Sequence, residues 1–246
     1  MIFQIYSDLH ITKNKFLPKL HKYCDYLILN GDIGKLSDKN YQKFIKNISK
    51  TWKKIFYIPG NHEFYAKEDI YELLNKYERF FSKFKNIIFM YNKTYELKNY
   101  LIIGTTLWSN PTKNFFKNHY NGRLSIRKNN KIQVLKSSDY IKLHKKCLLF
   151  LNSIKTNKTV ILITHYPLIQ YNTINRHYSP NKDVDSYSAN KIDFTKFPFY
   201  KNLKCVISGH THNSYDFNYK NVRFFSNQYG YIVDSNYFSM EGVCKL

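Results

Sequence analysis

The sequence predicts an α/β protein built from two β-sheets of mixed direction. In the first part of the chain, short apolar runs alternate with amphipathic helical stripes, the pattern of parallel strands joined by helices. Farther along, short β-like runs follow one another with only turn residues between them, which favours antiparallel hairpins. Five of the apolar runs end in Asp, Asn or His. The carboxyl ends of strands in open α/β sheets face a crevice that binds ligands, so these five ends predict one site.

The first ninety residues are expected to form strand-helix units. Residues 1–6, 25–29 and a run ending at Ile58 are apolar and short, as buried strands are. Residues 15–23 can form a short helix with Pro18 in its first turn. Residues 40–52 and 69–84 carry apolar side chains at helical spacing, for example Tyr41, Ile45 and Trp52, with lysines on the opposite face of the first helix.

The remaining elements are shorter and more mixed. Residues 86–91, 94–97 and 100–104 read as strands in antiparallel hairpins, and residues 108–132 as an irregular segment that is either a lid or a mobile insertion. A helix is expected from Ser137 or Ser138 to Ile154, with Ile141 and His144 on its buried face. Residues 160–164 and 205–208 are strands, 166–190 a loop beside the site, and 213–233 short strands with a turn at Lys220-Asn221.

Length and composition predict one domain spanning residues 1–246. No Pro-, Gly- or Ser-rich linker divides the chain, and a chain of this size can bury most of the surface that its unfolded form exposes. We expect a soluble protein without membrane association, because no signal peptide or apolar segment of transmembrane length is present. The four cysteines lack CxxC spacing and favour a reducing compartment, so an intracellular, cytoplasmic location is expected.

The formal net charge of +22 allows two interpretations. It can mark a polyanionic partner such as nucleic acid, held through counterion release. It can also reflect an A/T-rich genome, since Lys, Asn, Ile, Tyr and Phe are abundant and the basic residues are spread along the whole chain. The spread favours the compositional explanation slightly, and nucleic acid stays an open alternative.

Seven oxygen and nitrogen donors follow the apolar runs, and none of them is a cysteine. They are Asp8, His10, Asp32, Asn61, His165, His210 and His212. Such a set suits Mn, Fe or Zn and disfavours a structural zinc site built on thiolates. Seven donors exceed the needs of one ion, so we expect two ions about 3.5–4 Å apart with one carboxylate bridging them. The donors therefore predict a two-metal hydrolase.

The spacing within the motifs supports this interpretation. In an extended strand, the side chains of Asp8 and His10 lie on the same face and can bind one ion, and the second His-x-His pair repeats the geometry. A glycine precedes a donor at Gly31, Gly60 and Gly209. The missing Cβ lets the backbone turn sharply and approach a metal or a phosphate closely.

These motifs, in order and over the whole chain, resemble those of the calcineurin-like metallophosphoesterase superfamily. They are Asp8-x-His10, Gly31-Asp32, Gly60-Asn61-His62-Glu63, His165 and Gly209-His210-x-His212. The resemblance implies a four-layer αββα sandwich with two mixed β-sheets. The single domain is similar in size to the compact microbial, phage and viral members of the superfamily.

The resemblance also implies a role for each donor. One metal would be surrounded by Asp8, His10, Asp32 and His212, and the other by Asp32, Asn61, His165 and His210. Asp32 would bridge two divalent ions, Mn²⁺ by expectation, with Fe or Zn as alternatives. A metal-bridging hydroxide would attack phosphorus in line, while His62 contacts the phosphate or protonates the leaving group.

Departures from the family pattern narrow the substrate class. Protein phosphatases of the superfamily have a further Asp and Arg shortly after the bridging Asp, whereas this chain continues Ile33-Gly34-Lys35. A phosphoprotein substrate is therefore disfavoured, and the compact members commonly act on phosphodiesters or nucleotides. Arg176 can hold a substrate phosphate bidentately, or can be an ordinary exposed loop residue. Glu63 either orients His62 or starts a helix.

We therefore expect a metal-dependent phosphoric ester hydrolase acting on a phosphodiester or nucleotide, with Asp32 and His62 as catalytic residues and Asn61, His62 and Arg176 in contact with substrate. One alternative is a nuclease that holds DNA or RNA on its basic surface. Another is a catalytically inert nucleic-acid-binding protein, against which the intact donor set argues. The sequence leaves the oligomeric state open.

Overall fold

The first sheet carries the amino-terminal strand-helix units. The computed structural model describes residues 1–13, 20–120, 122–231 and 238–246. The sheet has the strand order β13 (Val243–Lys245), β1 (Ile2–Tyr6), β2 (Tyr26–Asn30), β3 (Lys54–Ile58) and β4 (Ile87–Phe89). Strands β1 to β4 are parallel, and β13 lies antiparallel to β1 at the edge.

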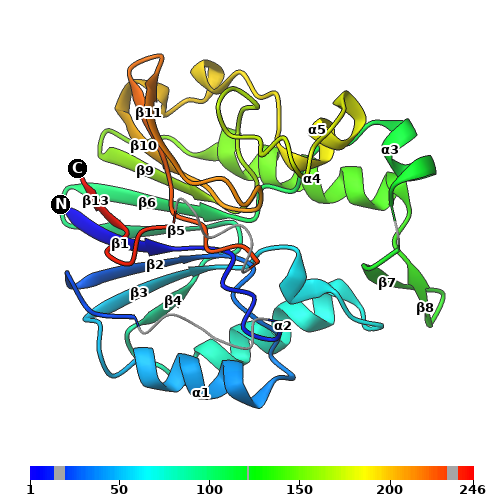
Figure 1. The fold of residues 1–246 in the computed structure, drawn as a ribbon, viewed down its shortest axis with the longest axis horizontal. Coiled ribbons are helices and arrows are strands. Elements are labelled where there is room, and N and C mark those ends of the chain that lie inside the picture. Colours follow the sequence, from blue (N-terminus) through cyan, green and yellow to red (C-terminus); the bar gives the residue numbers. More distant parts are fainter. Residues whose placement is uncertain (14–19, 121, 232–237) are drawn as a thin grey trace.

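The second sheet is also of mixed direction. Its order is β11 (Tyr215–Tyr219), β12 (Val222–Ser226), β10 (Leu203–Ile207), β9 (Thr159–Thr164), β6 (Tyr100–Thr105) and β5 (Lys93–Leu97). Its four central strands are parallel and its two edge strands antiparallel. A separate hairpin, β7 (Ser125–Lys128) and β8 (Lys131–Val134), projects at the right of Figure 1. Two sheets of mixed direction confirm the predicted fold class.

Helices cover the outer faces of both sheets. The first sheet packs against α1 (Lys39–Ile48) and α2 (Ile70–Phe81), and the second against α4 (Ser137–Ser153). Two shorter helices, α3 (Lys113–Asn118) and α5 (Lys182–Ser188), lie at the far end of the molecule beyond the strand ends (Figure 1). Single turns of 3-10 helix occur at His62–Phe64, Phe194–Lys196 and Tyr200–Asn202.

Three hydrophobic clusters separate the four layers. Alternate residues of β1 face opposite sides, so Phe3 and Ile5 join the cluster between the sheets while Tyr6 joins the cluster under α1 and α2. The third cluster lies between the second sheet and α4, around Leu143 and Leu162. Strands buried on both faces read as continuous apolar runs, which is why the sequence reveals them so clearly.

The predicted helices at 40–52 and 69–84 are confirmed, with shorter bounds. Each begins after an aspartate whose side chain accepts main-chain hydrogen bonds: Asp38 from Asn40 N, and Asp69 from Tyr71 N and Glu72 N. The expected helix at 15–23 lies outside the described residues at 15–19, and residues 20–23 are not helical.

The prediction of antiparallel hairpins holds for β5 and β6 but was wrong for the preceding strand. That strand, β4, pairs in parallel with β3, with Ile87 opposite Ile55 and Phe89 opposite Tyr57. Helix α2 joins these two strands, so β4 completes a third strand-helix unit instead of starting a hairpin. Its residues Ile87 and Phe89 fill the cluster beneath α2, and Ile88 packs against the cluster between the sheets.

Two segments expected to be irregular contain regular elements. Residues 108–132 include α3 and β7, and residues 166–190 include α5. Contacts between the two segments stabilise them: the Thr112 hydroxyl at the start of α3 donates to Asp183 Oδ1 of α5 at 2.7 Å, and the Phe115 ring stacks on Tyr187 of α5 at 4.5 Å. Neither segment shows a helical or strand-like spacing of hydrophobic residues in its sequence, because its elements are stabilised by contacts with the other segment.

The predicted helix at 137–154 is present as α4, but its buried face is rotated. Tyr140, Leu143, Cys147 and Leu151 are buried, whereas Ile141 and Leu148 are only partly covered. His144 is buried and its Nδ1 lies 2.5 Å from the Trp108 carbonyl oxygen, in keeping with the packing role expected of it. Among the described residues, no helix is both long and apolar enough to cross a membrane.

Candidate metal centre

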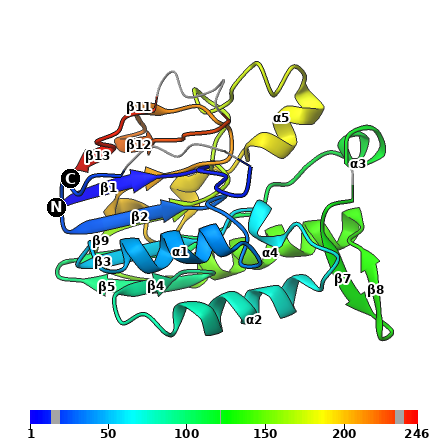
Figure 2. The same cartoon turned by 60° about the horizontal axis from the view of Figure 1, so that its bottom comes forward.

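Five parallel strands of the two sheets end at one edge of the sandwich. The loops after β1, β2, β3, β9 and β10 meet there (Figures 1 and 2). Main-chain bonds join them in pairs: Asp8 N donates to Gly31 O (3.0 Å), and Gly209 N donates to His165 O (2.9 Å). Asn30, the last residue of β2, links the two sheets, since its Nδ2 donates to Thr164 O at 2.9 Å. The motifs therefore share one site, as the strand ends predicted.

Five of the donors have left-handed backbone conformations. The φ values are +56° for Asp8, +45° for His10, +54° for Asp32, +72° for His210 and +51° for His212. The expectation that each pair lies in an extended strand was therefore wrong. The chain has already left the strand, and main-chain bonds such as His10 N to Asp32 O (2.9 Å) hold the turns in place.

The glycines of the motifs allow close approaches between the loops. A Cβ at Gly60 would overlap Asp32 Oδ1, and a Cβ at Gly209 would overlap Ser7 Oγ. Gly31 has φ +82°, a region open to glycine, and a Cβ there would meet the His165 ring. Each glycine thus makes room for a donor on another loop.

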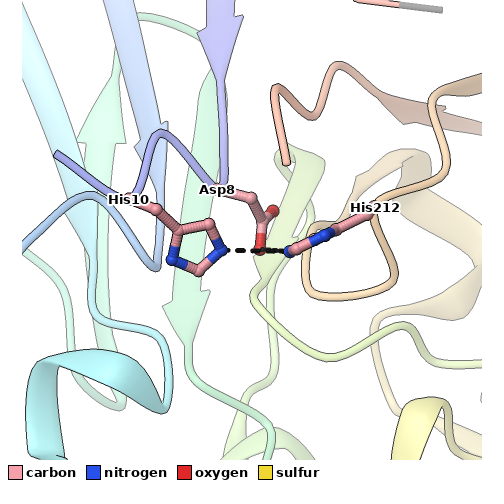
Figure 3. Close-up of side chains that lie close together, drawn as sticks. All are labelled: Asp8, His10 and His212. Carbon is pink, nitrogen blue, oxygen red and sulfur yellow. Dashed lines mark hydrogen bonds and ion pairs between the residues drawn. The ribbon is translucent and has the colours of Figure 1, made fainter. Parts of the chain in front are cut away.

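The first donor group consists of Asp8, His10 and His212 (Figure 3). The Nε2 atoms of His10 and His212 face each other at 3.0 Å, and His212 Nε2 lies 3.7 Å from Asp8 Oδ1. Main-chain N–H of His210 donates to both oxygens of Asp8. Burial raises the pKa of Asp8 to about 6, although the neighbouring histidines oppose the shift. Two imidazole nitrogens and a carboxylate converging in this way fit a divalent cation.

The second donor group consists of Asp32, His165 and His210, with Asn61 beside them. The Nδ1 of His165 lies 3.0 Å from the Asn30 carbonyl oxygen, to which it can only donate. In the neutral ring the Nε2 lone pair then faces Asn61 Oδ1 at 3.0 Å and Asp32 Oδ1 at 3.4 Å. The Nδ1 of His210 is buried without a hydrogen-bond partner. With His165 in its neutral form, the ligand atoms of this group lie within 4.8 Å of one another and also fit a cation.

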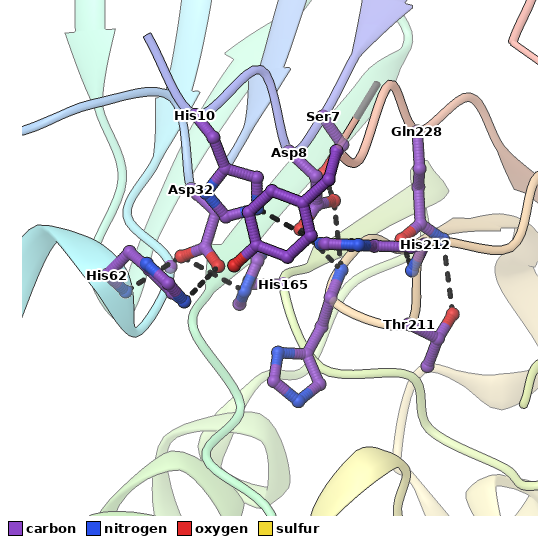
Figure 4. A network of polar contacts seen from close by, with 12 residues as sticks. Ser7, Asp8, His10, Asp32, His62, His165, Thr211, His212 and Gln228 are labelled. Carbon is purple, nitrogen blue, oxygen red and sulfur yellow. Dashed lines mark hydrogen bonds and ion pairs between the residues drawn. The ribbon is translucent and has the colours of Figure 1, made fainter. Parts of the chain in front are cut away.

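Asp32 connects the two groups (Figure 4). It belongs to the second group and also to a third, with His10 and His62, in which the ligand atoms again lie within 4.8 Å of one another. His165 responds to this carboxylate: burial lowers the pKa of His165, but the charge of Asp32, its hydrogen bond to the ring and the charge of Asp8 together outweigh burial and raise the pKa to about 9. All seven predicted donors are therefore brought together around Asp32.

His62 stands at the open side of the centre. It begins a 3-10 turn, and its Nε2 lies 3.7 Å from Asp32 Oδ2. Its ring contacts the rings of His10 (4.7 Å) and Tyr65 (4.5 Å). Burial lowers the pKa of His62 to about 4 in spite of Asp32, so the ring is neutral at neutral pH.

Glu63 fastens two of the donor loops together, a role that the sequence reasoning missed. Its side chain is buried, and burial followed by the charge of Asp32 raises its pKa to about 7. The carboxylate accepts five hydrogen bonds of 2.8–3.4 Å, from main-chain N–H of Asp32, Ile33, Gly34 and Gly60 and from the Tyr57 hydroxyl. Glu63 thereby sets the position of Asp32 relative to Asn61.

A cavity of about 360 Å³ opens above the donors. Its walls come from the donors themselves and from α3, α5 and neighbouring loops, including Tyr65, Phe115, Arg123, Tyr178, Tyr187 and Tyr231. Arg176 is not among the lining residues; its guanidinium pairs with Asp185 at 2.8 Å and is largely exposed. Arg123 is the arginine at the cavity, in a segment where the sequence offered no motif.

The fold and the donor set define the class of metal-dependent hydrolases of phosphate esters. The chain belongs to the calcineurin-like phosphoesterase family, whose model matches residues 2–214. The family resemblance seen in the motifs is thus confirmed, and the protein is a metal-dependent phosphoesterase by family.

Two relatives illustrate the range of similarity. The "Uncharacterized protein L509" of Acanthamoeba polyphaga mimivirus is 32% identical over 228 residues, which cover 87% of this chain and 81% of that protein. The solved structure of phosphopantetheinyl hydrolase from Mycobacterium tuberculosis superposes with a TM-score of 0.69 at 16% identity, covering 99% of this chain and 95% of that one. The structural likeness shows a shared metallophosphoesterase fold.

Proposed function

We propose that this protein is a two-metal phosphoesterase that hydrolyses phosphodiesters or nucleotides. The observation that carries the proposal is the position of Asp32, whose carboxylate takes part in donor groups on both sides of it. A carboxylate so placed can bridge two cations, and a two-metal site neutralises charge on both the attacking and the leaving oxygen.

In this proposal Asp32 binds both ions and each of the other six donors binds one. Asp8, His10, Asp32 and His212 hold one ion, and Asp32, Asn61, His165 and His210 hold the other. Asn61 is already oriented for this role, because its Nδ2 donates to the Tyr65 hydroxyl at 2.6 Å and leaves Oδ1 toward His165. When bound, two Mn²⁺ ions would polarise the phosphoryl oxygens and supply a nucleophilic water at neutral pH.

His62 is the residue we propose to act on the leaving group. Its main-chain N–H donates to Asp32 Oδ1 at 2.8 Å, so the ring is held beside the centre and lines the cavity. A neutral imidazole can hydrogen-bond the substrate phosphate, and the negative charge of a bound phosphate raises the affinity of that ring for a proton. The proton can then pass to the departing oxygen.

The cavity walls favour a substrate with a planar ring over a phosphorylated side chain of a protein. Phe115, Tyr178 and Tyr187 line it, and a volume of about 360 Å³ matches a small organic ligand. Aromatic walls suit the stacking of a nucleobase. The nuclease alternative needs the same centre, with the chain's +22 charge holding a longer strand.

A single assay tests the proposal. Purified protein is supplied with Mn²⁺, Fe²⁺ or Zn²⁺ and offered bis-p-nitrophenyl phosphate and p-nitrophenyl phosphate. We expect metal-dependent hydrolysis with the diester preferred, and loss of that activity in Asp32→Asn. An inert protein would hydrolyse neither ester with any metal, and a preference for the monoester would refute a phosphodiester substrate and leave nucleotides as the substrate class.

A further inference from the structure

Three cations contact two tyrosines that line the cavity, Tyr65 and Tyr231. Lys13 Nζ donates to the Tyr231 hydroxyl at 3.0 Å and lies 4.9 Å from the centre of that ring. Lys35 Nζ donates to the main-chain oxygen of Tyr65 at 2.6 Å, and the Arg123 guanidinium lies 5.4 Å from the Tyr65 ring. They come from three separate loops, so the fold gathers them at this place.

Both tyrosines touch the metal centre. The Tyr231 ring stacks on His10 at 4.8 Å and meets His212 at 4.9 Å, while the Tyr65 ring lies 4.5 Å from His62. Tyr65, Tyr231 and Arg123 all line the cavity. The cations therefore stand next to the reacting position, around the same opening.

No carboxylate in the described parts of the chain forms an ion pair with any of the three, whereas Arg127 and Arg176 elsewhere each have one. Their charges instead oppose each other. Burial and the charge of Arg123 lower the pKa of Lys13 although the charge of Asp32 opposes them, and burial together with Lys13 and Arg123 lowers the pKa of Lys35. Cations gathered in this way, with no ion-pair partner among the described residues, are stabilised when an anion binds.

The reacting phosphate does not account for them. In the proposed centre two divalent ions would already neutralise it, and further positive charge beside those ions would weaken metal binding. A second anion, farther from the centre, gives the cluster a function that compensates for this repulsion. A phosphate suits it, because the planar guanidinium can bind two oxygens while the lysines act as point charges.

We propose that Lys13, Lys35 and Arg123 bind a second, unreacting phosphate of the substrate. The inference rests on the proposed phosphoesterase function and narrows it: the preferred substrate is a phosphodiester that carries another phosphate on one of its two ester groups. A substrate with only the scissile phosphate leaves the cluster without a partner.

The test compares substrates that differ by one phosphate. The thymidine dinucleotide TpT is offered beside its 5′-phosphorylated and 3′-phosphorylated forms, and kcat/KM is measured for each. We expect one phosphorylated form to be preferred by about tenfold, the scale of a charged hydrogen bond. In Lys13→Gln and Arg123→Gln this preference should fall toward one. Lys35 is left unchanged because it also holds the Tyr65 main chain.

Lys50→Gln is the matched control. Lys50 is exposed just beyond the carboxyl end of α1, and the same loss of one charge there should leave the preference intact. Equal preference for all three dinucleotides in the wild type, with bis-p-nitrophenyl phosphate still hydrolysed, would overturn the inference and leave the proposed function standing.

A binding measurement covers the case in which no ester is hydrolysed. The full-length protein is titrated with thymidine 3′,5′-bisphosphate and with the two thymidine monophosphates in EDTA, which stops metal-dependent turnover. We expect the bisphosphate to bind about tenfold tighter, and Arg123→Gln to remove the difference. Equal affinity for all three nucleotides overturns the inference independently of catalysis.

Discussion

Replacing Glu63 by glutamine tests whether this residue holds the two donor loops together. The carboxylate only accepts hydrogen bonds, and it receives five of them from four main-chain N–H groups and one hydroxyl. A glutamine must turn its NH₂ group toward some of these donors. In one orientation it faces Asp32 N and Gly60 N, and in the other it faces Ile33 N and Gly34 N.

Each orientation therefore loses two bonds to main-chain N–H. A hydrogen bond to a charged group contributes about 1.5–3 kcal/mol. Removing a buried charge recovers part of that loss, since burial has already raised the pKa of Glu63 to about 7. We therefore expect Glu63→Gln to lower the free energy of unfolding by about 3 kcal/mol, which is the lower limit for the loss of two such hydrogen bonds. For a chain of this size the Tm should fall by about 6–12 °C.

The assay is thermal unfolding followed by circular dichroism, with metal content measured on the same sample. Glu241→Gln is the control, because Glu241 is exposed and the same substitution there should leave the Tm unchanged. We also expect Glu63→Gln to bind metal less tightly, since Asp32 and Asn61 lose their fixed spacing. A Glu63→Gln variant that has the same Tm as the wild type and retains full metal content would refute the reasoning.

Three further predictions concern the centre and the charge. Asp32→Asn should remove metal from both positions, whereas His212→Ala should mainly deplete one; elemental analysis showing full two-metal occupancy in Asp32→Asn would contradict the bridge. The His62→Asn variant should keep its metals and lose about 10²-fold or more in turnover of a diester with an alkyl leaving group. The loss should be smaller for a diester that releases p-nitrophenolate, because this leaving group needs no proton. Equal losses on both substrates would rule out proton donation. If the +22 charge has the function of binding nucleic acid, the logarithm of the affinity for duplex DNA should fall linearly with the logarithm of the salt concentration, with a slope of about 0.9 per neutralised phosphate. An affinity that does not change with salt would show that the charge reflects composition.

The strand ends could be predicted from the sequence because their signal is local. Each apolar run is buried on both faces and ends in a donor, as Ile207 precedes Ser208, Gly209 and His210. Parallel strands bring such ends to one edge whatever the details of packing. That rule alone gathered all seven donors, although no two of the motifs are adjacent in the chain.

The geometry within each motif could not be predicted in the same way. The spacing of Asp8 and His10 fits an extended strand as well as a turn, and bonds from other loops decide between them. Glu63 shows the same limit. Its neighbour His62 suggests a catalytic motif, but the five donors that determine its role come from residues 57 to 60 and 32 to 34.

The residues of the cavity walls were the part of the site that the sequence predicted least well. Helix α3 has six residues and is held by its stack on Tyr187, a contact between segments about seventy residues apart. Arg123 and Lys13 are two basic residues among 39, and nothing in the local sequence distinguishes them from surface charges. Their significance depends on Tyr65 and Tyr231, which the fold alone brings to the same opening.

The left-handed backbone conformation of five donor residues has a consequence for the evolution of this protein. A residue other than glycine costs about 1 kcal/mol or more in that conformation, so Asp8, His10, Asp32, His210 and His212 together reduce stability. Selection for the chemistry opposes their replacement, together with the main-chain hydrogen bonds that Asp8 and Asp32 accept. In a lineage released from that selection, glycine or asparagine should accumulate at these five positions while the buried strands persist. Such descendants would keep the sandwich, melt at a higher temperature and be identifiable as former enzymes from these positions alone.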